Sequence, residues 1–477
     1  MSAIENCKNR IKEGDARTYV EILGGYYSQV KEEQLSEETI RKARITLFDF
    51  LTVLLVGRKY TVLSPLCRTY LNSKKTGEEC VALGLNIKTS QELAALAMGI
   101  VSHGVELDDG QRSSSAHPAV AILPCIMAVA QKNNNTLDEI VKSIVLAYDC
   151  MLRVACAINP SHVSRGFHPT STCGPIGAAM AAASLNHLGG KETVNAIGIG
   201  ALQGAGIQEM LHCDASSIKP LQPGKAAMAG VIAAEFAALG AKTPLLVFEG
   251  ELGWLNAMAD EYDETVLIGG LGESWYSDYC YTKLYPSCRY IHAPIDIALQ
   301  FRSQEIDWRQ IERMELYMSK YAIAEVGLIK RPVCFEEALY SAAYSIALAL
   351  VYGKVRIEEI YSGMRSDEIL ALSEKVQVIE DEEQNQRHPK ESGARIVLVT
   401  RDGGRYDQFL PVAKADYDTP ITDEEYIGKA RSTLEGDVAE KEIQVLWDLV
   451  VESDRKAAAC ADIVRQMVKM ADTASRE

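Results

Sequence analysis

The stretch PLQPGKAAMAGVIAAEFAALG, residues 220–240, predicts a helix that is built almost entirely from small side chains. Alanine and glycine allow two helix axes to approach closely, so this composition is typical of a helix inside a bundle. The same composition recurs at 173–188 and 191–208, where two further helices are expected. Aromatic residues make up only 7% of the chain, which favours packed helices over a sandwich or barrel. The sequence therefore predicts a buried helical bundle.

Helical patterns continue over about the first 265 residues, and the pattern then changes. Strand-like runs stand at 313–319 and 375–381, and a later DGG turn between two extended segments predicts a hairpin. From about residue 421 the chain is helical again, and these last helices are expected to pack on the first domain. We therefore predict a mostly α fold, with a large all-helical domain over 1–268 and 418–477 and a smaller α+β lid domain over 269–417.

Charge and composition argue against several classes of function. The formal net charge is −16, the sequence pI is about 5.1 and no Lys/Arg-rich stripe is present, so nucleic acid is not an expected partner. The polar N-terminus lacks the apolar core of a signal peptide, and the longest apolar run, 45–57, contains Asp49. We therefore expect a buried helix and no membrane span. Twelve cysteines without a CxxC pair favour reduced thiols and a cytoplasmic location.

Three basic side chains stand just ahead of predicted helices made of small residues: His117, His168 and Lys219. A helix start carries unpaired N–H groups and the positive end of the helix dipole, so an added cation or imidazole makes an anion site. Because the whole chain is acidic, an anionic substrate needs such a local cationic pocket. We predict that the three side chains converge on a small polycarboxylate as catalytic groups. The alternative is that they lie on three unrelated loops.

The segment HGVELDDGQRSSSAHPA, which begins at His103, is the densest polar cluster in the chain. His103 and Glu106 are three residues apart and can share one face of a helix end. Asp108 and Asp109 follow, and a buried carboxylate beside His117 would tune that imidazole as an acid or base. The alternative is that the two aspartates brace a loop. The spacing of these groups fits no common metal template, so no metal site is predicted.

Two further segments supply candidate ligands for a carboxylate. Lys225 lies in the same Pro-Gly helix start as Lys219, and a lysine there can act as a point cation. Cys288, Arg289 and His292 fall within one turn, where Arg289 could grip a carboxylate with paired N–H groups. Cys288 as a nucleophile with His292 as its base is the less favoured alternative, since most cysteines are structural.

In their order along the chain, these segments resemble the MmgE/PrpD family, which includes 2-methylcitrate dehydratase, cis-aconitate decarboxylase and iminodisuccinate epimerase. The resemblance is carried by SIKPLQPGKAAMAGVIAAEFAALG, LLVFEGELGW, TKLYPSCRYIHAPID and KRPVCFEEALYSAAY. It implies an all-helical domain completed by the C-terminal helices, an α+β lid domain, a homodimer, and a cofactor-free site between the domains for di- and tricarboxylates. His117, His168 and Lys219 fall on the family's active-site motifs, and the segment 288–292 belongs to the lid's share of the site.

The resemblance also limits the choice of reaction. Where members of the decarboxylase type carry Asp, Thr, His and Tyr, this chain has Glu106, Gly110, Cys288 and, near the tyrosine position, Leu328. We therefore predict a cofactor-independent lyase that dehydrates a small hydroxy-polycarboxylate of the 2-methylcitrate type. An epimerase or isomerase of a dicarboxylate such as iminodisuccinate, a decarboxylase of the cis-aconitate type, and a non-catalytic carboxylate-binding protein are the alternatives.

The predicted reaction moves a proton next to a substrate carboxylate. His168 or His117 would remove this proton, and the other histidine, or a water that it holds, would protonate the departing hydroxyl. Lys219 and Arg289 would bind carboxylates and stabilise the developing enediolate-like charge. Besides the three catalytic residues, the residues expected to contact the substrate are His103, Glu106, Asp108, Asp109, Lys225, Cys288, Arg289 and His292.

Overall fold

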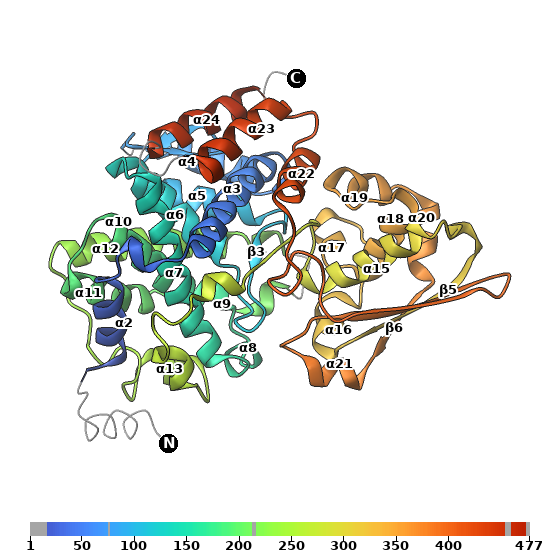
Figure 1. Ribbon diagram of the computed structural model, residues 1–477, viewed down its shortest axis with the longest axis horizontal. Coiled ribbons are helices and arrows are strands. Elements are labelled where there is room, and N and C mark those ends of the chain that lie inside the picture. Colours follow the sequence, from blue (N-terminus) through green and yellow to red (C-terminus); the bar gives the residue numbers. More distant parts are fainter. Residues whose placement is uncertain (1–16, 75–76, 212–215, 454–458, 474–477) are drawn as a thin grey trace. The chain divides into compact units, whose positions relative to one another are not determined.

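The computed structural model describes residues 17–74, 77–211, 216–453 and 459–473 of the chain, which divides into two compact units. The first unit contains the described parts of 1–104, 108–280 and 434–477, and the second contains 105–107 and 281–433. Figure 1 shows a mostly helical first unit, whereas the second combines helices with a four-stranded sheet. The predicted fold class, mostly α with a smaller α+β part, is therefore confirmed.

The first unit consists of long helices and a short strand pair. Strands β1 (Cys80–Ala82) and β2 (Ile87–Thr89) are antiparallel, with Cys80 opposite Thr89. The other elements of this unit are α2 (Tyr19–Tyr27), α3 (Glu37–Tyr60), α4 (Ser64–Asn72), α5 (Gln91–His103), β3 (Asp109–Gly110), α6 (Pro118–Asn133), α7 (Leu137–Ile158), α8 (Ser161–Ser164), α9 (Pro169–Thr172), α10 (Gly174–Leu185), α11 (Gly190–Ala201), α12 (Leu221–Ala238), α13 (Trp254–Met258), α14 (Glu264–Ile268), α23 (Glu440–Trp447) and α24 (Cys460–Thr473).

Small residues decide how closely the central helices of this unit pack. Helix α12 packs on α5 and α10. A Cβ built on Gly230 of α12 would lie 2.3 Å from the Cβ of Ala178 in α10, and one built on Gly99 of α5 would lie 2.6 Å from the Cα of Gly224 in α12. Real side chains do not approach so closely, so these helix crossings require glycine. The Ala- and Gly-rich stretches thus form the buried bundle that the sequence predicted.

The second unit is built around a sheet in the order β6–β5–β7–β8. Strands β5 and β6 are parallel, whereas β7 is antiparallel to both β5 and β8. The predicted DGG hairpin is the turn between β7 and β8, with Val399 opposite Arg405. The elements of this unit are β4 (Tyr281–Thr282), α15 (His292–Ser303), β5 (Ile311–Met318), α16 (Lys320–Val326), α17 (Phe335–Ala338), α18 (Ala342–Tyr352), α19 (Ile357–Gly363), α20 (Asp367–Glu374), β6 (Val376–Glu380), α21 (Glu382–Arg387), β7 (Ala394–Thr400), β8 (Arg405–Leu410) and α22 (Asp423–Thr433).

The two compact units divide at positions that differ from the expected domain boundaries at 268 and 418. Residues 269–280 go with the helical unit, because Arg153 of α7 donates to the carbonyl of Gly269 at 2.6 Å. Helix α22 goes with the second unit, where Lys429 donates to the carbonyl of Leu107 at 3.0 Å. The contacts of α22 thus group this helix with the second unit, whereas the sequence placed it with the first domain. The units divide after Cys280 and before Leu434.

The longest apolar run of the sequence lies in α3, where residues 47–57 are buried, as predicted. In the part of the chain that the structure describes, no single helix combines the length and the apolar composition needed to cross a membrane. Only α3 and α4 taken together meet that test, and the pair is bent by 89°.

Candidate active site

Each of the three predicted basic side chains lies ahead of a helix in the first unit. His117 directly precedes α6, His168 directly precedes α9, and Lys219 lies two residues before α12. The backbone N–H of His117 donates to Thr170 Oγ1 at 3.0 Å, which ties the first two helix starts together. His168 and Lys219 are buried, and the charges of Lys219, His117 and His103 all act on the His168 imidazole. The structure thus brings the three helix starts together and adds His103 as a fourth basic group.

Asp108 joins two of these histidines through one carboxylate oxygen. Its Oδ2 lies 3.1 Å from Nδ1 of His103 and 3.1 Å from Nδ1 of His117, and the two ring centroids are 5.2 Å apart. Nδ1 of His117 also lies 2.8 Å from the backbone carbonyl of Asp109. Because carbonyl and carboxylate oxygens only accept, Nδ1 of His117 carries a proton, and Nε2 is the atom left for acid–base chemistry.

His168 is held as a neutral base by a residue that the sequence analysis missed. Its Nδ1 lies 3.1 Å from Oε1 of Gln222, and the amide nitrogen of Gln222 donates to the carbonyl of Ile207 at 3.4 Å. This second bond orients the amide, so His168 donates from Nδ1 and keeps the lone pair on Nε2. Burial, and after it the positive charge of Lys219, lowers the pKa of His168 well below its ordinary value. Gln222 lies three residues after Lys219, a spacing that faces one side of a helix start.

Two of the predicted substrate contacts hold the scaffold in this structure. The Asp109 carboxylate accepts the N–H of Ala119 at 3.0 Å and the hydroxyl of Tyr148 at 2.9 Å, which fixes the start of α6 against α7. Burial raises the pKa of Asp109 to about 7. Lys225 donates to the backbone carbonyl of Ala205 at 2.7 Å, so its ammonium group holds the loop after α11. For Asp109 the geometry therefore matches the bracing role weighed as the alternative.

Glu106 lies in the second unit, where two side chains engage its carboxylate. Lys283 Nζ lies 2.7 Å from Oε2, and the Tyr340 hydroxyl donates to Oε1 at 2.9 Å. Lys283 is fully buried, and a buried lysine needs a charged or strongly polar partner. Lys283 lies in the TKLYPSC motif, but no feature of the sequence singled it out as a site residue. No local pattern names a partner that is 177 positions away along the chain.

The Arg289 guanidinium binds several groups of its own chain. It donates to the carbonyls of Ala413 and Lys414, both at 3.2 Å, and to the Asp416 carboxylate at 3.0 Å. The guanidinium also stacks over the Tyr281 ring, 4.4 Å from its centroid. A buried arginine must satisfy its donors, and segment 413–416 does so here. An internal ion pair therefore engages the Arg289 guanidinium here, and its grip on a substrate carboxylate stays a prediction.

The surroundings of Cys288 and His292 in the second unit favour the uncharged form of both side chains. Burial raises the pKa of the Cys288 thiol to about 12, so a thiolate nucleophile does not form there at neutral pH. Burial, and after it the charges of Arg289 and Lys283, lowers the pKa of His292 well below its usual range. Across the described residues, no group of three or more His, Cys, Asp or Glu side chains is placed to hold a metal ion.

Two family models match the sequence of the chain. The one described as the MmgE/PrpD N-terminal domain matches residues 21–266, and the one described as the MmgE/PrpD C-terminal domain matches residues 285–454.

Several curated proteins are similar along most of their length. A cis-aconitate decarboxylase-like protein of Aspergillus oryzae is 24% identical over 460 residues, which covers 91% of this chain and 94% of that protein. The cis-aconitate decarboxylase of Aspergillus terreus is 24% identical over 459 residues, covering 90% and 91% of the two chains. The human cis-aconitate decarboxylase is 24% identical over 380 residues, covering 76% and 78%.

Proposed function

Because the chain belongs to the MmgE/PrpD family, we propose that it is a cofactor-independent lyase that acts on a small di- or tricarboxylate. The reaction favoured is dehydration of a hydroxy-polycarboxylate of the 2-methylcitrate type. The observation that carries the proposal is the neutral imidazole of His168, buried beside Lys219, His117 and His103. Such a group of basic side chains attracts a polycarboxylate and supplies a base beside it.

In this mechanism His168 and His117 divide the proton transfers. Nε2 of His168 takes the proton from the carbon next to a substrate carboxylate, and Lys219 stabilises the charge that moves onto that carboxylate. His117, which Asp108 orients, gives a proton to the departing hydroxyl. The electron pair of the broken C–H bond becomes the new C=C bond as the C–O bond breaks. The products are water and an unsaturated polycarboxylate.

Decarboxylation of cis-aconitate is the second candidate, because two Aspergillus relatives with that activity in their names align over nine-tenths of the chain. In that reaction a carboxylate leaves as carbon dioxide, and an acid delivers a proton to the carbon that it leaves. No base has to remove a proton from carbon, so the neutral His168 favours dehydration. Glu106 and Cys288, which differ from the residues of decarboxylase-type members at these positions, also favour dehydration.

Product analysis separates these reactions. Purified protein is incubated with citrate, 2-methylcitrate, cis-aconitate and iminodisuccinate, and the mixtures are followed by NMR. Loss of water from a hydroxy acid is the expected result. Loss of carbon dioxide from cis-aconitate would instead support decarboxylation, the second candidate. Solvent deuterium that enters unreacted substrate without elimination would indicate an epimerase. Binding without conversion of any compound would contradict an enzyme. A parallel incubation with a chelator tests the prediction that no metal is needed.

The proposal includes a homodimer, with a face supplied by the first unit. Large apolar side chains are exposed in one stretch of the sequence: Leu202, Ile207, Phe236, Leu239, Leu246 and Leu252. Large apolar side chains that stay exposed on a chain are candidates for an interface between proteins. The cytoplasmic location and the lack of a nucleic-acid partner stay predictions from composition.

A further inference from the structure

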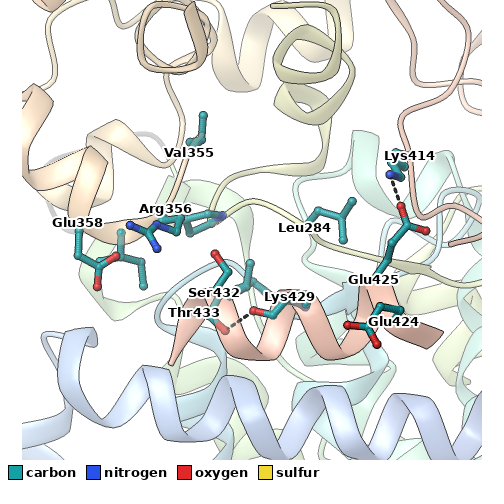
Figure 2. A pocket seen from close by; sticks show the side chains of 14 residues that line it. Leu284, Val355, Arg356, Glu358, Lys414, Glu424, Glu425, Lys429, Ser432 and Thr433 are labelled. Atoms are coloured by element: carbon teal, nitrogen blue, oxygen red, sulfur yellow. Dashed lines mark hydrogen bonds and ion pairs between the residues drawn. The ribbon is translucent and has the colours of Figure 1, made fainter. Parts of the chain in front are cut away.

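A cavity of about 400 Å³ lies beside α22 in the second unit, and Figure 2 shows the side chains that line it. Lys414 is paired with Glu425, and Lys429 donates to the Leu107 carbonyl at 3.0 Å. These lining cations are thus engaged within the chain, so they select no class of ligand.

The first unit contains a buried histidine, His162 of α8, that the proposed mechanism does not use. Its Nδ1 lies 2.8 Å from the Met258 carbonyl, and its Nε2 lies 2.7 Å from the hydroxyl of Thr172 in α9. Its ring stacks on the Phe167 ring, with the centroids 5.0 Å apart and the planes inclined by 11°. Phe167 directly precedes His168, and Thr172 follows His168 by four residues. We propose that His162 is a positioning residue for His168, a role that rests on the proposed function of His168 as the base.

One arrangement of hydrogens satisfies the neutral ring of His162. A carbonyl oxygen only accepts, so Nδ1 carries the proton and donates to Met258. Burial lowers the pKa of His162, so the ring is neutral at neutral pH and Nε2 can accept. The Thr172 hydroxyl is therefore the donor to Nε2. Through these two bonds the ring joins α9 to the end of α13.

The Thr172 hydroxyl lies between the two histidines. Its oxygen is 3.2 Å from the His168 carbonyl, whereas Nε2 of His162 is nearer, at 2.7 Å. The His168 carbonyl also accepts the backbone N–H groups of Ser171, at 2.9 Å, and of Thr172, at 3.1 Å, which close the turn of α9. By holding Thr172, His162 fixes the turn from which the His168 imidazole extends to Gln222.

The stacking of His162 on Phe167 supports the chain on the other side of His168. The backbone of Phe167 forms an antiparallel bridge with Ile207. Gln222, which bonds the His168 imidazole, donates to the carbonyl of the same Ile207. The stacked ring therefore supports both the base and the amide that orients it.

Paired substitutions of Thr172 separate positioning from packing. Thr172→Val keeps the shape of the side chain but removes the hydroxyl, and we expect kcat to fall by about 10- to 100-fold through displacement of the base. KM should stay within about threefold, because the basic groups that attract the substrate remain. Thr172→Ser keeps the hydroxyl and should keep kcat within about threefold. As a control, Thr52→Val removes another buried hydroxyl, bonded to the Asp49 carbonyl at 2.8 Å, and should leave kcat unchanged.

NMR of protein made with isotope-labelled histidine reads the base without a substrate. The ring-nitrogen shifts of His168 should show one tautomer, protonated at Nδ1, in the wild type and in Thr172→Ser. In Thr172→Val they should move toward the average of two tautomers, because the ring loses its fixed place beside Gln222. Circular dichroism confirms folding of each variant. If Thr172→Val does not fold, His162→Phe repeats the test, since it keeps a ring against Phe167 but loses both hydrogen bonds.

Two results would refute the positioning role: His168 ring shifts that stay unchanged in the folded Thr172→Val protein, or a loss of kcat in Thr172→Ser equal to that in Thr172→Val. Absence of turnover in the wild type would refute the lyase proposal instead. The ring shifts would then still decide whether His162 positions His168, because they require no turnover.

Discussion

At the scale of single residues, burial shifts the pKa values of a base and an acid of the first unit in opposite directions. Both His168 and Asp109 lose the stabilisation that water gives to a charge, so each favours its neutral form. For the imidazole this means a lower pKa and a free lone pair at neutral pH. For the Asp109 carboxyl it means a pKa of about 7. The neutral base is useful for taking a proton from carbon, whereas Asp109 is occupied by Ala119 and Tyr148.

Replacement of His168 tests its role as the base. His168→Ala removes Nε2, and we expect kcat to fall by about 100- to 10,000-fold, the usual contribution of general acid–base catalysis. The fold should persist, because the imidazole is hydrogen-bonded to Gln222, whereas the bonds to Gly206, Ser171 and Thr172 use the backbone of His168, which the variant keeps. Kinetics on the substrate found by NMR and a thermal melt measure both effects. Full turnover in the folded variant would rule out His168 as the base.

The pKa of His168 itself can be measured and moved. Lys219 is the charge that lowers it most, so Lys219→Met should raise the pKa of His168 toward its ordinary value. In the wild type the imidazole stays neutral down to a pH well below 6.5, and in the variant the imidazolium should appear at higher pH. NMR titration of the ring, assigned with a His168→Gln sample, gives both values. Equal pKa values would show that Lys219 is too far away to act on the ring.

At the scale of helices and strands, local patterns predicted where elements begin but not what their ends contact. The small residues of 220–240 indicated α12, and the pattern placed Lys219 at its start. The pattern could not place Gln222 on His168, because that contact spans 54 residues and depends on how α9 and α12 meet. The same limit applies to Arg289, which the sequence predicted to bind a substrate carboxylate but which contacts a carboxylate of the chain in this structure. The carboxylate is Asp416, 127 positions away, and belongs to the chain itself.

Two glycines in helix interiors should respond oppositely to the same substitution. Gly230→Ala in α12 would place a Cβ 2.3 Å from Ala178, so we expect a loss of about 1–3 kcal/mol through overpacking. Gly428→Ala in α22 meets open space and should gain about 0.5–1 kcal/mol from helix propensity. Scanning calorimetry of both variants gives the two shifts. A stabilised Gly230→Ala protein would show that α10 and α12 do not cross as closely as described.

At the scale of the whole molecule, the fold class followed from composition and periodicity, while the division into units did not. Composition is a sum over the chain, so a helical region and an α+β region remain visible in it. The division depends on single contacts, such as Arg153 with Gly269 and Lys429 with Leu107, that no local pattern encodes. For the same reason the net charge of −16 argued against nucleic acid as a partner but could not choose among anionic substrates.

The homodimer can be tested by placing a charge on the apolar side chains that the first unit exposes. Phe236 is 55% exposed and Leu239 is 84% exposed, so neither supports the core of its own chain. A Phe236→Glu/Leu239→Glu double variant would bury two carboxylates in an interface, which is unfavourable unless they are paired. Analytical ultracentrifugation should therefore show the wild type as a dimer and the variant at roughly half its mass. Leu328→Glu, at a site 77% exposed in the second unit, should stay dimeric. A wild-type monomer, or a double variant that stays dimeric, would remove this face from the assembly.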